Sequence, residues 1–125
     1  MSKSIMEIVA AAKQAVPAIS PAEATAMMGR DDVLVVDVRD LPELADGGKI
    51  KGAIQVSRGM LEFRADETTP YHNPAFSQGK TIILYCASGG RAALSGKALM
   101  DLGYAKVRNL GAFKDWVAAG GAVEK

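Results

Sequence analysis

Two uninterrupted apolar runs constrain the fold of this 125-residue chain more than any other feature. Val33 to Val36 consists of valine and leucine and ends at Asp37, and Thr81 to Tyr85 ends at Cys86. Short continuous apolar runs that are rich in β-branched residues are typical of strands covered on both faces. The two runs therefore predict a sheet whose inner strands lie between two layers of helices.

Helices are expected between and after these runs. Ser20 followed by Pro21 is a typical helix start, and this helix should stop at Gly29. A longer helix is expected from about Gly90 to Leu102, after which a glycine can end it. Shorter helical segments are expected around Leu41–Ala45, around Met60–Phe63 and from Gly111 onward.

Three shorter strands complete the predicted pattern: Ala18–Ser20, Ala53–Val56 and Val107–Leu110. Strands that alternate with helices in this way usually form parallel sheets, because the connecting helices pack on the faces of the sheet. The sequence therefore predicts an α/β fold with a central, mostly parallel five-stranded sheet and helices on both faces.

The amino-terminal segment has an amphipathic pattern. Apolar residues recur at helical spacing, namely Ile5, Ile8, Val9, Ala12 and Val16. Glu7 and Lys13 interrupt the apolar core that a signal peptide would need, and no run in the chain is long enough to span a membrane. We expect residues 1–17 to form a helix packed on a domain of residues 18–125, in the cytoplasm. A helix that binds a partner is the alternative.

Composition excludes several classes of function. The net charge of +1 provides no basis for binding nucleic acid or an anionic membrane. The single cysteine excludes an internal disulfide and a cysteine-rich metal site, and the single histidine excludes a zinc site built from histidines. We therefore expect no resident metal and no cofactor.

Cys86 lies where the second apolar run meets a glycine turn and the predicted helix. The thiol should face backbone N–H groups and the positive end of that helix, which favour a thiolate. The following loop supplies those N–H groups, two glycines that tolerate positive φ, a hydroxyl and a terminal cation. Its residues are Ala87, Ser88, Gly89, Gly90 and Arg91. The arrangement predicts a nucleophilic cysteine in an anion-binding loop, although Arg91 can alternatively be a surface residue at a helix start.

Four pieces of the sequence, in order, resemble the rhodanese-like sulfurtransferases, and the chain is most similar to a single-domain rhodanese. The resemblance extends from about Ile19 to Ala122. The pieces are Val35–Arg39 with Glu43 downstream, Gly48–Ile54, Cys86–Arg91 and Gly103–Gly120. Each piece coincides with the kind of structural element expected for it, so the match is specific for a rhodanese-like fold.

The resemblance implies transfer of a sulfane sulfur from thiosulfate, a persulfide or a polysulfide to a thiol or cyanide, through a persulfide on Cys86. The acceptor includes the thiol of another protein, and the expected state is a monomer or weak dimer. Ala87 and Ser88 are neutral where thiosulfate-using relatives often carry a basic side chain, which leaves Arg91 alone to neutralise a dianion. We therefore expect weak use of thiosulfate.

Several other residues are weaker candidates for the site. Asp37 ends its strand at the edge of the sheet where Cys86 also lies, and parallel sheets bind ligands at that edge. Asp37 and Arg39 are expected to orient loops and to pair with Glu43 rather than to act in catalysis. Three residues of the irregular segment 58–78 either reach the pocket or occupy an exposed loop: Arg58, Arg64 and His72.

Two other classes of function remain open. A cysteine phosphatase or arsenate reductase can use a similar loop on a related fold, but its loop has one residue more between cysteine and arginine than the four present here. A phosphatase also needs a carboxylic acid that protonates the leaving group, and the sequence identifies none. The other alternative is a non-catalytic, regulatory or binding module of rhodanese-like fold, for which loss of the cysteine would be typical.

Overall fold

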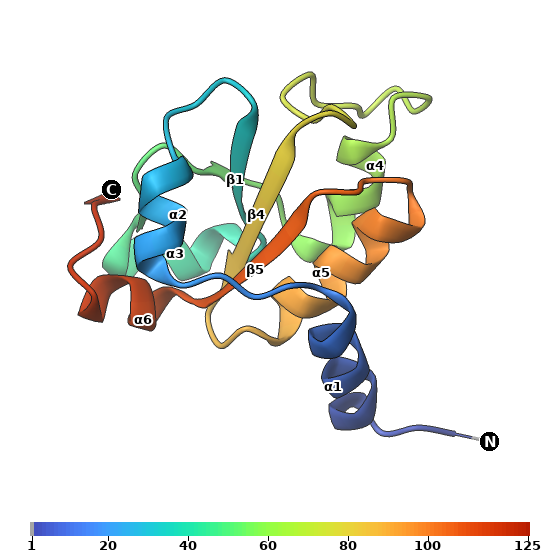
Figure 1. Ribbon diagram of the computed structural model, residues 1–125, viewed down its shortest axis with the longest axis horizontal. Helices are drawn as coiled ribbons and strands as arrows, with labels where there is room; N and C mark the ends of the chain where they lie inside the picture. Colours follow the sequence, from blue (N-terminus) through green and yellow to red (C-terminus); the bar gives the residue numbers. More distant parts are fainter. Residues whose placement is uncertain (1) are drawn as a thin grey trace.

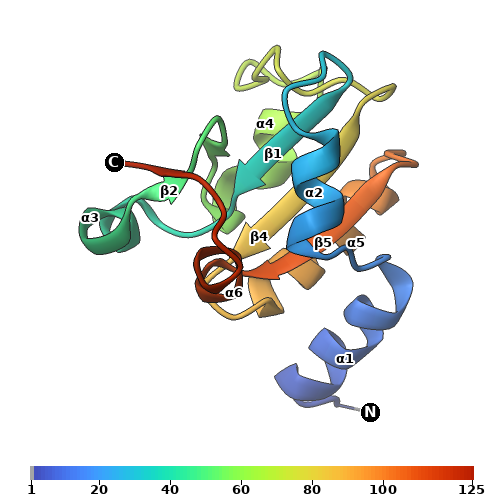
Figure 2. The ribbon, with the colours of Figure 1, turned by 60° about the vertical axis from the view of Figure 1, so that its left-hand side comes forward.

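A computed structural model describes residues 2–125 of the chain. Its centre is a parallel sheet, whose carboxyl ends all point to one side of the molecule (Figure 2). In spatial order the strands are β3 (Ile54–Gln55), β1 (Val33–Asp37), β4 (Thr81–Cys86) and β5 (Val107–Ala112). The two apolar runs of the sequence thus occupy the inner positions, as predicted.

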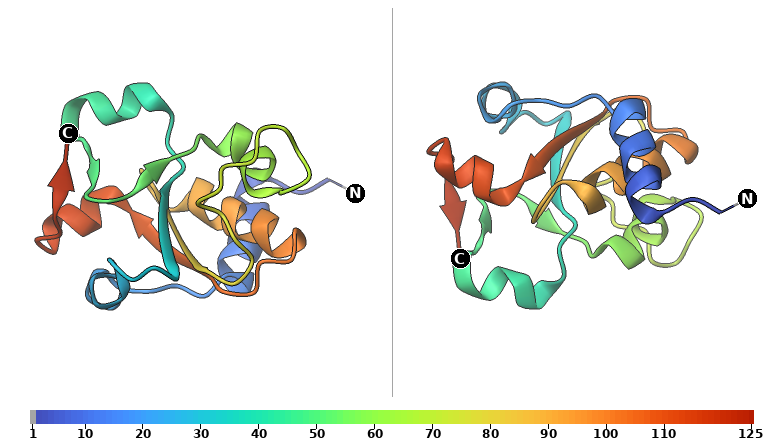
Figure 3. Two further views of the ribbon diagram at one scale, coloured as in Figure 1. Left: turned by 90° about the horizontal axis from the view of Figure 1, so that it is seen from above. Right: turned by 90° about the horizontal axis from the view of Figure 1, so that it is seen from below.

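Helices cover both faces of this sheet (Figure 3). One layer consists of α1 (Ile5–Ala15), α4 (Leu61–Ala65) and α5 (Gly90–Asp101). The opposite layer consists of α2 (Pro21–Met27) and α6 (Phe113–Ala118). Alternate residues of the inner strands point to the two layers, since Ile82 and Leu84 belong to one apolar cluster and Ile83 to the other. This two-sided burial explains why the strands are apolar throughout.

The helix boundaries agree with the signals in the sequence. The Ser20 hydroxyl accepts a hydrogen bond from the backbone of Glu23, while the Glu23 carboxylate accepts one from the backbone of Ser20, which is a complete capping box for α2. Gly29 follows α2 with φ +88°, and Gly103 follows α5 with φ +103°. The helix predicted at residues 90–102 ends one residue earlier, at Asp101.

The expected count of five strands is wrong, because the main sheet has four strands within residues 2–125. Ala18 forms only an isolated parallel bridge to Asn109. Pro17 has no backbone N–H, and the helix α2 begins at Pro21, so too few residues are left for a strand. The predicted strand at Ala53–Val56 is likewise shorter, at Ile54–Gln55.

The carboxyl-terminal part of the chain contains two further departures from the expectation. The predicted helix start at Gly111 is wrong, because β5 continues to Ala112 through an irregularity in its pairing with β4. In addition, β2 (Lys49–Ile50) and β6 (Val123–Glu124) pair as a small antiparallel sheet beside the main one. Two-residue strands produce no periodic pattern, so the sequence contained no signal for them. Short helices η1 (Leu41–Glu43), α3 (Leu44–Gly47) and η2 (Arg58–Met60) complete the fold.

The helix α1 packs against α5, next to the glycine turn that follows β4 (Figure 1). A Cβ built on Gly96 of α5 would lie 2.8 Å from Val16 Cγ1, and one built on Gly90 would lie 4.0 Å from Val9 Cγ1. Val9 and Val16 are buried in this contact, whereas Ile5 and Met6 near the start of α1 are exposed. Among residues 2–125, none of the helices combines the length and the apolar character needed to span a membrane.

Candidate active site

The candidate site lies at the edge of the sheet where the parallel strands end. Asp37 pairs in register with Tyr85, so the last residue of β1 is next to the residue before Cys86. From Cys86 the chain turns directly into α5, and this turn lies at the lower end of the sheet in Figure 1. The expectation that Asp37 and Cys86 share one edge of the sheet is therefore confirmed.

The sulfur of Cys86 accepts two backbone hydrogen bonds. The N–H of Gly89 lies 3.0 Å from Sγ, and the N–H of Ala92 lies 3.4 Å from it. The expected donors were the N–H groups from Ala87 to Arg91. In the structure Gly89 is the donor within that loop, and the second donor, Ala92, lies one residue beyond it in the first turn of α5. These two N–H groups and the amino terminus of a 12-residue helix stabilise negative charge on the sulfur.

Only one of the two loop glycines needs the conformational freedom of glycine. Gly89 has φ +97° and ψ −16°, a left-handed conformation that glycine adopts without strain, and its N–H donates to Sγ. Gly90 has no positive φ, so the expectation of a special backbone conformation at this position is wrong. Gly89 also lies close to the bulged end of β5, since a Cβ built on it would be 3.6 Å from Gly111 Cα.

Arg91, at the end of the loop, forms a two-pronged ion pair with Glu43. Its Nη1 donates to Glu43 Oε2 at 2.7 Å, and its Nη2 donates to Oε1 at 2.9 Å. The backbone N–H of Asp40 donates to the same Oε2 at 2.8 Å. The hydrogen bonds from Arg91, followed by the one from Asp40, lower the pKa of the Glu43 carboxyl from 4.5 to about 2. Arg91 is therefore the partner of a fully ionised carboxylate.

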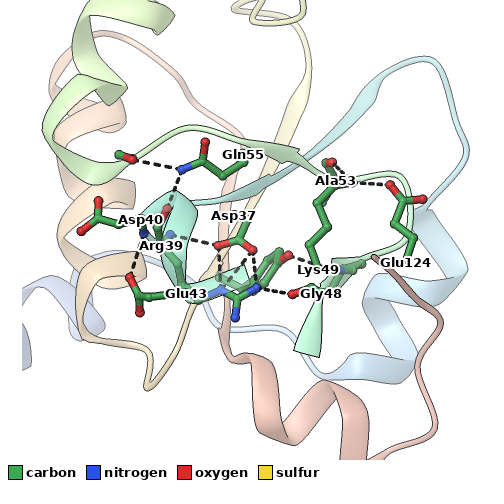
Figure 4. A network of polar contacts seen from close by, with 12 residues as sticks. Asp37, Arg39, Asp40, Glu43, Gly48, Lys49, Ala53, Gln55 and Glu124 are labelled. Carbon is green, nitrogen blue, oxygen red and sulfur yellow. Dashed lines mark hydrogen bonds and ion pairs between the residues drawn. The ribbon is translucent and has the colours of Figure 1, made fainter. Parts of the chain in front are cut away.

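Asp37 and Arg39 form a buried ion pair that holds the loop after β1 (Figure 4). Arg39 Nε lies 3.0 Å from Asp37 Oδ1, its Nη2 lies 2.7 Å from Oδ2, and Nη2 also donates to the carbonyl oxygen of Gly48 at 2.8 Å. The guanidinium lies 4.4 Å from the centre of the Phe113 ring. The expected partnership of these two residues with Glu43 is wrong, because Glu43 pairs with Arg91.

Further polar contacts fix the same loop from its other side. Gln55 donates to the carbonyl oxygen of Arg39 at 2.6 Å, and Lys49 contacts both the carbonyl oxygen of Ala53 and the carboxylate of Glu124. Figure 4 shows these side chains around the loop from Asp40 to Gly48. The sequence contained no local signal for Gln55 or Glu124, since Gln55 meets the Arg39 carbonyl where β3 lies beside β1, and Glu124 meets Lys49 where β6 pairs with β2.

The structure separates the weaker candidates from one another. Arg58 follows β3 near the candidate site, because its backbone N–H donates to the carbonyl oxygen of Val38, but its side chain pairs with Glu62 at 2.7 Å. Arg64 donates a hydrogen bond to the carbonyl oxygen of Tyr71. Nε2 of His72 lies 3.3 Å from the carbonyl oxygen of Phe76.

Arg64 and His72 belong to the region that leads into the amino-terminal end of β4, at the top of Figure 1. From Thr81, the first residue of β4, to Cys86, its last, the strand extends over five residue steps, or about 17 Å at the usual rise per residue. The structure therefore does not bring Arg64 or His72 to the cysteine loop.

The Ala92 N–H is a group that the sequence analysis missed. The first four N–H groups of any helix lack partners within the helix, so counting into the first turn of the predicted helix at Gly90 would have included Ala92. Glu43 was noted only as a partner for Arg39. Its true partner, Arg91, is 48 positions away in the chain, and no local pattern indicates such a pairing.

Comparison with known proteins agrees with this geometry. A solved structure from Rhodopseudomonas palustris, of a protein of unknown function and possible tyrosine phosphatase, matches with a TM-score of 0.90 and 37% identity over 99% of this chain and 96% of that one. The polysulfide-sulfur transferase homodimer of Wolinella succinogenes matches with a TM-score of 0.75 and 28% identity over 94% of this chain and 85% of that one.

A sulfurtransferase of Allochromatium vinosum is 32% identical over 80 residues, which are 64% of this chain and 66% of that protein. The chain thus spans slightly less than two thirds of the length of this relative. The sequence pattern of the rhodanese-like domain family matches residues 20–119. With most of its length matched, and with the cysteine loop at the carboxyl edge of a parallel sheet, the chain belongs to the rhodanese-like domain family.

Proposed function

We propose that the protein is a sulfurtransferase that carries a sulfane sulfur on Cys86 as a persulfide. The observation that carries the proposal is the pair of backbone N–H groups, from Gly89 and Ala92, that donate to Sγ. Fixed donors at this position stabilise an attacking thiolate and, after transfer, a negatively charged outer sulfur. Membership of the rhodanese-like domain family supports the same chemistry.

The reaction has two steps that share the covalent intermediate. The Cys86 thiolate attacks the outer sulfur of a persulfide donor, R–S–SH. The S–S bond of the donor breaks, R–S⁻ leaves with the electron pair, and Cys86–S–SH forms. In the second step a thiolate or cyanide attacks the outer sulfur, the Cys86 thiolate leaves, and the acceptor keeps the sulfur. Cyanide would thus become thiocyanate.

The second step requires an acceptor from outside the chain. Cys86 is the only cysteine, so no second thiol can release the sulfur by forming an intramolecular disulfide. A small thiol, a thiol of another protein or cyanide fulfils this role. On the donor side, the exposed Ala87 and Ser88 contribute no charge, which favours a persulfide or polysulfide over thiosulfate.

Access to the sulfur is a further part of the proposal. Cys86 has no exposed surface, whereas Ala87 and Ser88 directly after it are exposed. A donor therefore has to reach Sγ by displacing this short segment. The side chains of Ala87 and Ser88 are small, so the displacement breaks no large apolar contact.

Intact-mass spectrometry tests the proposal directly. Incubation of the wild-type protein with glutathione persulfide or inorganic polysulfide should add the mass of one sulfur atom, and cyanide should remove it with formation of thiocyanate. Cys86→Ser should fold normally, as judged by its circular dichroism and unfolding midpoint, and gain no mass. A Cys86→Ser protein that still transfers sulfur, or a wild-type protein that gains none, would refute the proposal.

A phosphatase activity is the second candidate, because the solved Rhodopseudomonas palustris protein, 37% identical, is described as a possible tyrosine phosphatase. Four residues separate Cys86 from Arg91, fewer than a phosphatase loop needs to enclose a tetrahedral oxyanion, and Arg91 is occupied by Glu43. Hydrolysis of p-nitrophenyl phosphate that depends on Cys86, without sulfur loading, would favour this candidate. Absence of both activities would favour a non-catalytic binding module.

A further inference from the structure

Arg91, the cation at the end of the cysteine loop, is already paired with a carboxylate within the protein. Both terminal nitrogens of Arg91 donate to the carboxylate of Glu43, at 2.7 and 2.9 Å. Two parallel hydrogen bonds of this kind combine charge attraction with fixed orientation, so they hold the guanidinium more firmly than a single contact does. Arg91 therefore contributes little net positive charge to an anion that approaches Cys86.

Glu43 stays ionised throughout the range in which such a protein works. Its Oε2 also accepts the backbone N–H of Asp40, and these hydrogen bonds keep the pKa of the carboxyl at about 2. In return, Glu43 raises the pKa of Arg91 above its ordinary value. The two opposite charges therefore remain paired, and neither is removed by titration near neutrality.

The fold positions Glu43 for this contact. The chain from Asp40 to Gly48 is anchored at both ends by Arg39, which binds Asp37 through its side chain and the carbonyl oxygen of Gly48. The buried ion pair thereby fixes the segment η1, in which Glu43 is the last residue. The position of Glu43 opposite Arg91 thus depends on a buried anchor and not on a mobile surface contact.

Donors of different charge should respond differently to this arrangement. Thiosulfate carries two negative charges to the site, and its leaving group, sulfite, carries them away. An alkyl persulfide carries at most one charge on its reacting sulfurs, and the N–H groups of Gly89 and Ala92 can accommodate that charge. A neutral pair at the loop end therefore disfavours the dianion more than the persulfide.

We propose that Glu43 is a positioning residue that determines donor specificity, because it neutralises Arg91 and so restricts the site to alkyl persulfides rather than dianionic donors. This inference rests on the proposed sulfurtransferase function. Replacing the Glu43 carboxylate by an amide would leave a hydrogen-bond acceptor in place but would free the positive charge of Arg91. The variant should then accept thiosulfate.

The test compares wild type, Glu43→Gln, Glu43→Asp and Asp101→Asn. Asp101 also forms an ion pair, with Lys97, but at the far end of α5, about 16 Å along the helix axis from Gly90. Asp101→Asn therefore matches the change in net charge and the loss of an ion pair without affecting the cysteine loop. For each protein, kcat and KM are measured with thiosulfate and with glutathione persulfide, using cyanide as the acceptor.

Glu43→Gln should raise kcat/KM for thiosulfate about tenfold, equivalent to about 1.4 kcal/mol, mainly through a lower KM. Its kcat/KM for glutathione persulfide should change less than about threefold. The gain should disappear in high salt, because exposed charges are then screened. Glu43→Asp, which keeps the charge, and Asp101→Asn should retain the wild-type preference.

Three results would overturn the inference. The first is an unchanged ratio of kcat/KM for thiosulfate to kcat/KM for glutathione persulfide in Glu43→Gln. The second is an equal gain in kcat/KM for thiosulfate in Asp101→Asn. The third is a wild-type KM for thiosulfate that rises steeply with salt, which would mean that Arg91 already binds the dianion. The last measurement needs no variant and so does not depend on the folding of Glu43→Gln. A wild-type protein that loads no sulfur from either donor would refute the proposed function itself, whereas a loading protein with an unchanged ratio refutes only the role of Glu43.

Discussion

Gly89→Ala is the substitution that most directly probes how the loop holds the sulfur. Gly89 has φ +97°, which an alanine adopts only with strain, and its N–H donates to Sγ of Cys86 at 3.0 Å. The added methyl group would not itself collide, because the nearest atom, Gly111 Cα, would be 3.6 Å away. The perturbation is therefore a change of backbone conformation, and it falls on a donor to the reactive sulfur.

The expected loss of stability is modest. A left-handed conformation costs a residue other than glycine about 1–2 kcal/mol, and alanine recovers about 0.4–1 kcal/mol because its unfolded chain has less freedom. The free energy of unfolding should thus fall by about 1 kcal/mol, which lowers the unfolding midpoint of a chain of this size by about 3–5 °C. Loss of a hydrogen bond to a charged sulfur is worth about 1.5–3 kcal/mol. Sulfur loading should therefore slow by at least about tenfold.

Gly90→Ala is the matched control, since Gly90 has no positive φ and its Cβ would lie 4.0 Å from Val9. Its unfolding free energy should stay the same or rise, by up to about 1 kcal/mol, because alanine is the better helix former. Both variants are assayed by urea unfolding and by the rate of sulfur loading in intact-mass spectrometry. Equal losses in stability and loading rate for the two alanine variants would refute the reasoning from backbone conformation.

Two further predictions concern packing and pH. Gly96→Ala should lower the free energy of unfolding, measured by urea unfolding, by about 1–2 kcal/mol. The reason is that overpacking against Val16 and Val107 outweighs the gain in helix propensity. An unchanged unfolding midpoint would contradict the close contact between α1 and α5. The depressed pKa of Glu43 means that its ion pair stabilises the fold above about pH 4.5 and ceases to do so as the pH falls toward 2. The difference between the pKa of Glu43 in the folded protein and its ordinary value corresponds to about 3 kcal/mol of unfolding free energy. We reduce this to about 1 kcal/mol, because a third of the side chain is exposed and solvent screens the ion pair. The difference in unfolding free energy between wild type and Glu43→Gln should therefore shrink between about pH 6 and pH 3, and a constant difference would count against this assignment.

Local signals in the sequence were sufficient for most of the architecture. The apolar runs at β1 and β4 identified the inner strands, because a strand buried on both faces has no polar side to interrupt it. Ser20 with Pro21 marked the start of α2, and the cysteine between β4 and α5 marked the carboxyl edge of the sheet as the candidate site. Each of these features depends only on neighbouring residues.

Contacts between distant parts of the chain were not accessible in this way. The sequence predicted Glu43 beside Arg39 and Arg91 as a ligand for an anion, whereas the structure pairs Glu43 with Arg91. It also expected a fifth strand at Ala18–Ser20, where the structure has one bridge. Such pairings depend on how loops from separate strands approach one another, and a loop can present the same charged residue to several partners.

The sequence by itself determined that a lone cysteine follows a buried parallel strand and precedes a helix, because strand burial and helix starts are properties of adjacent residues. Only the tertiary structure decided which N–H groups reach the sulfur and that the Arg91 charge is balanced. The reason is physical: a hydrogen bond or ion pair requires two groups within about 3 Å, and for residues 48 positions apart that distance is set by the packing of the whole domain.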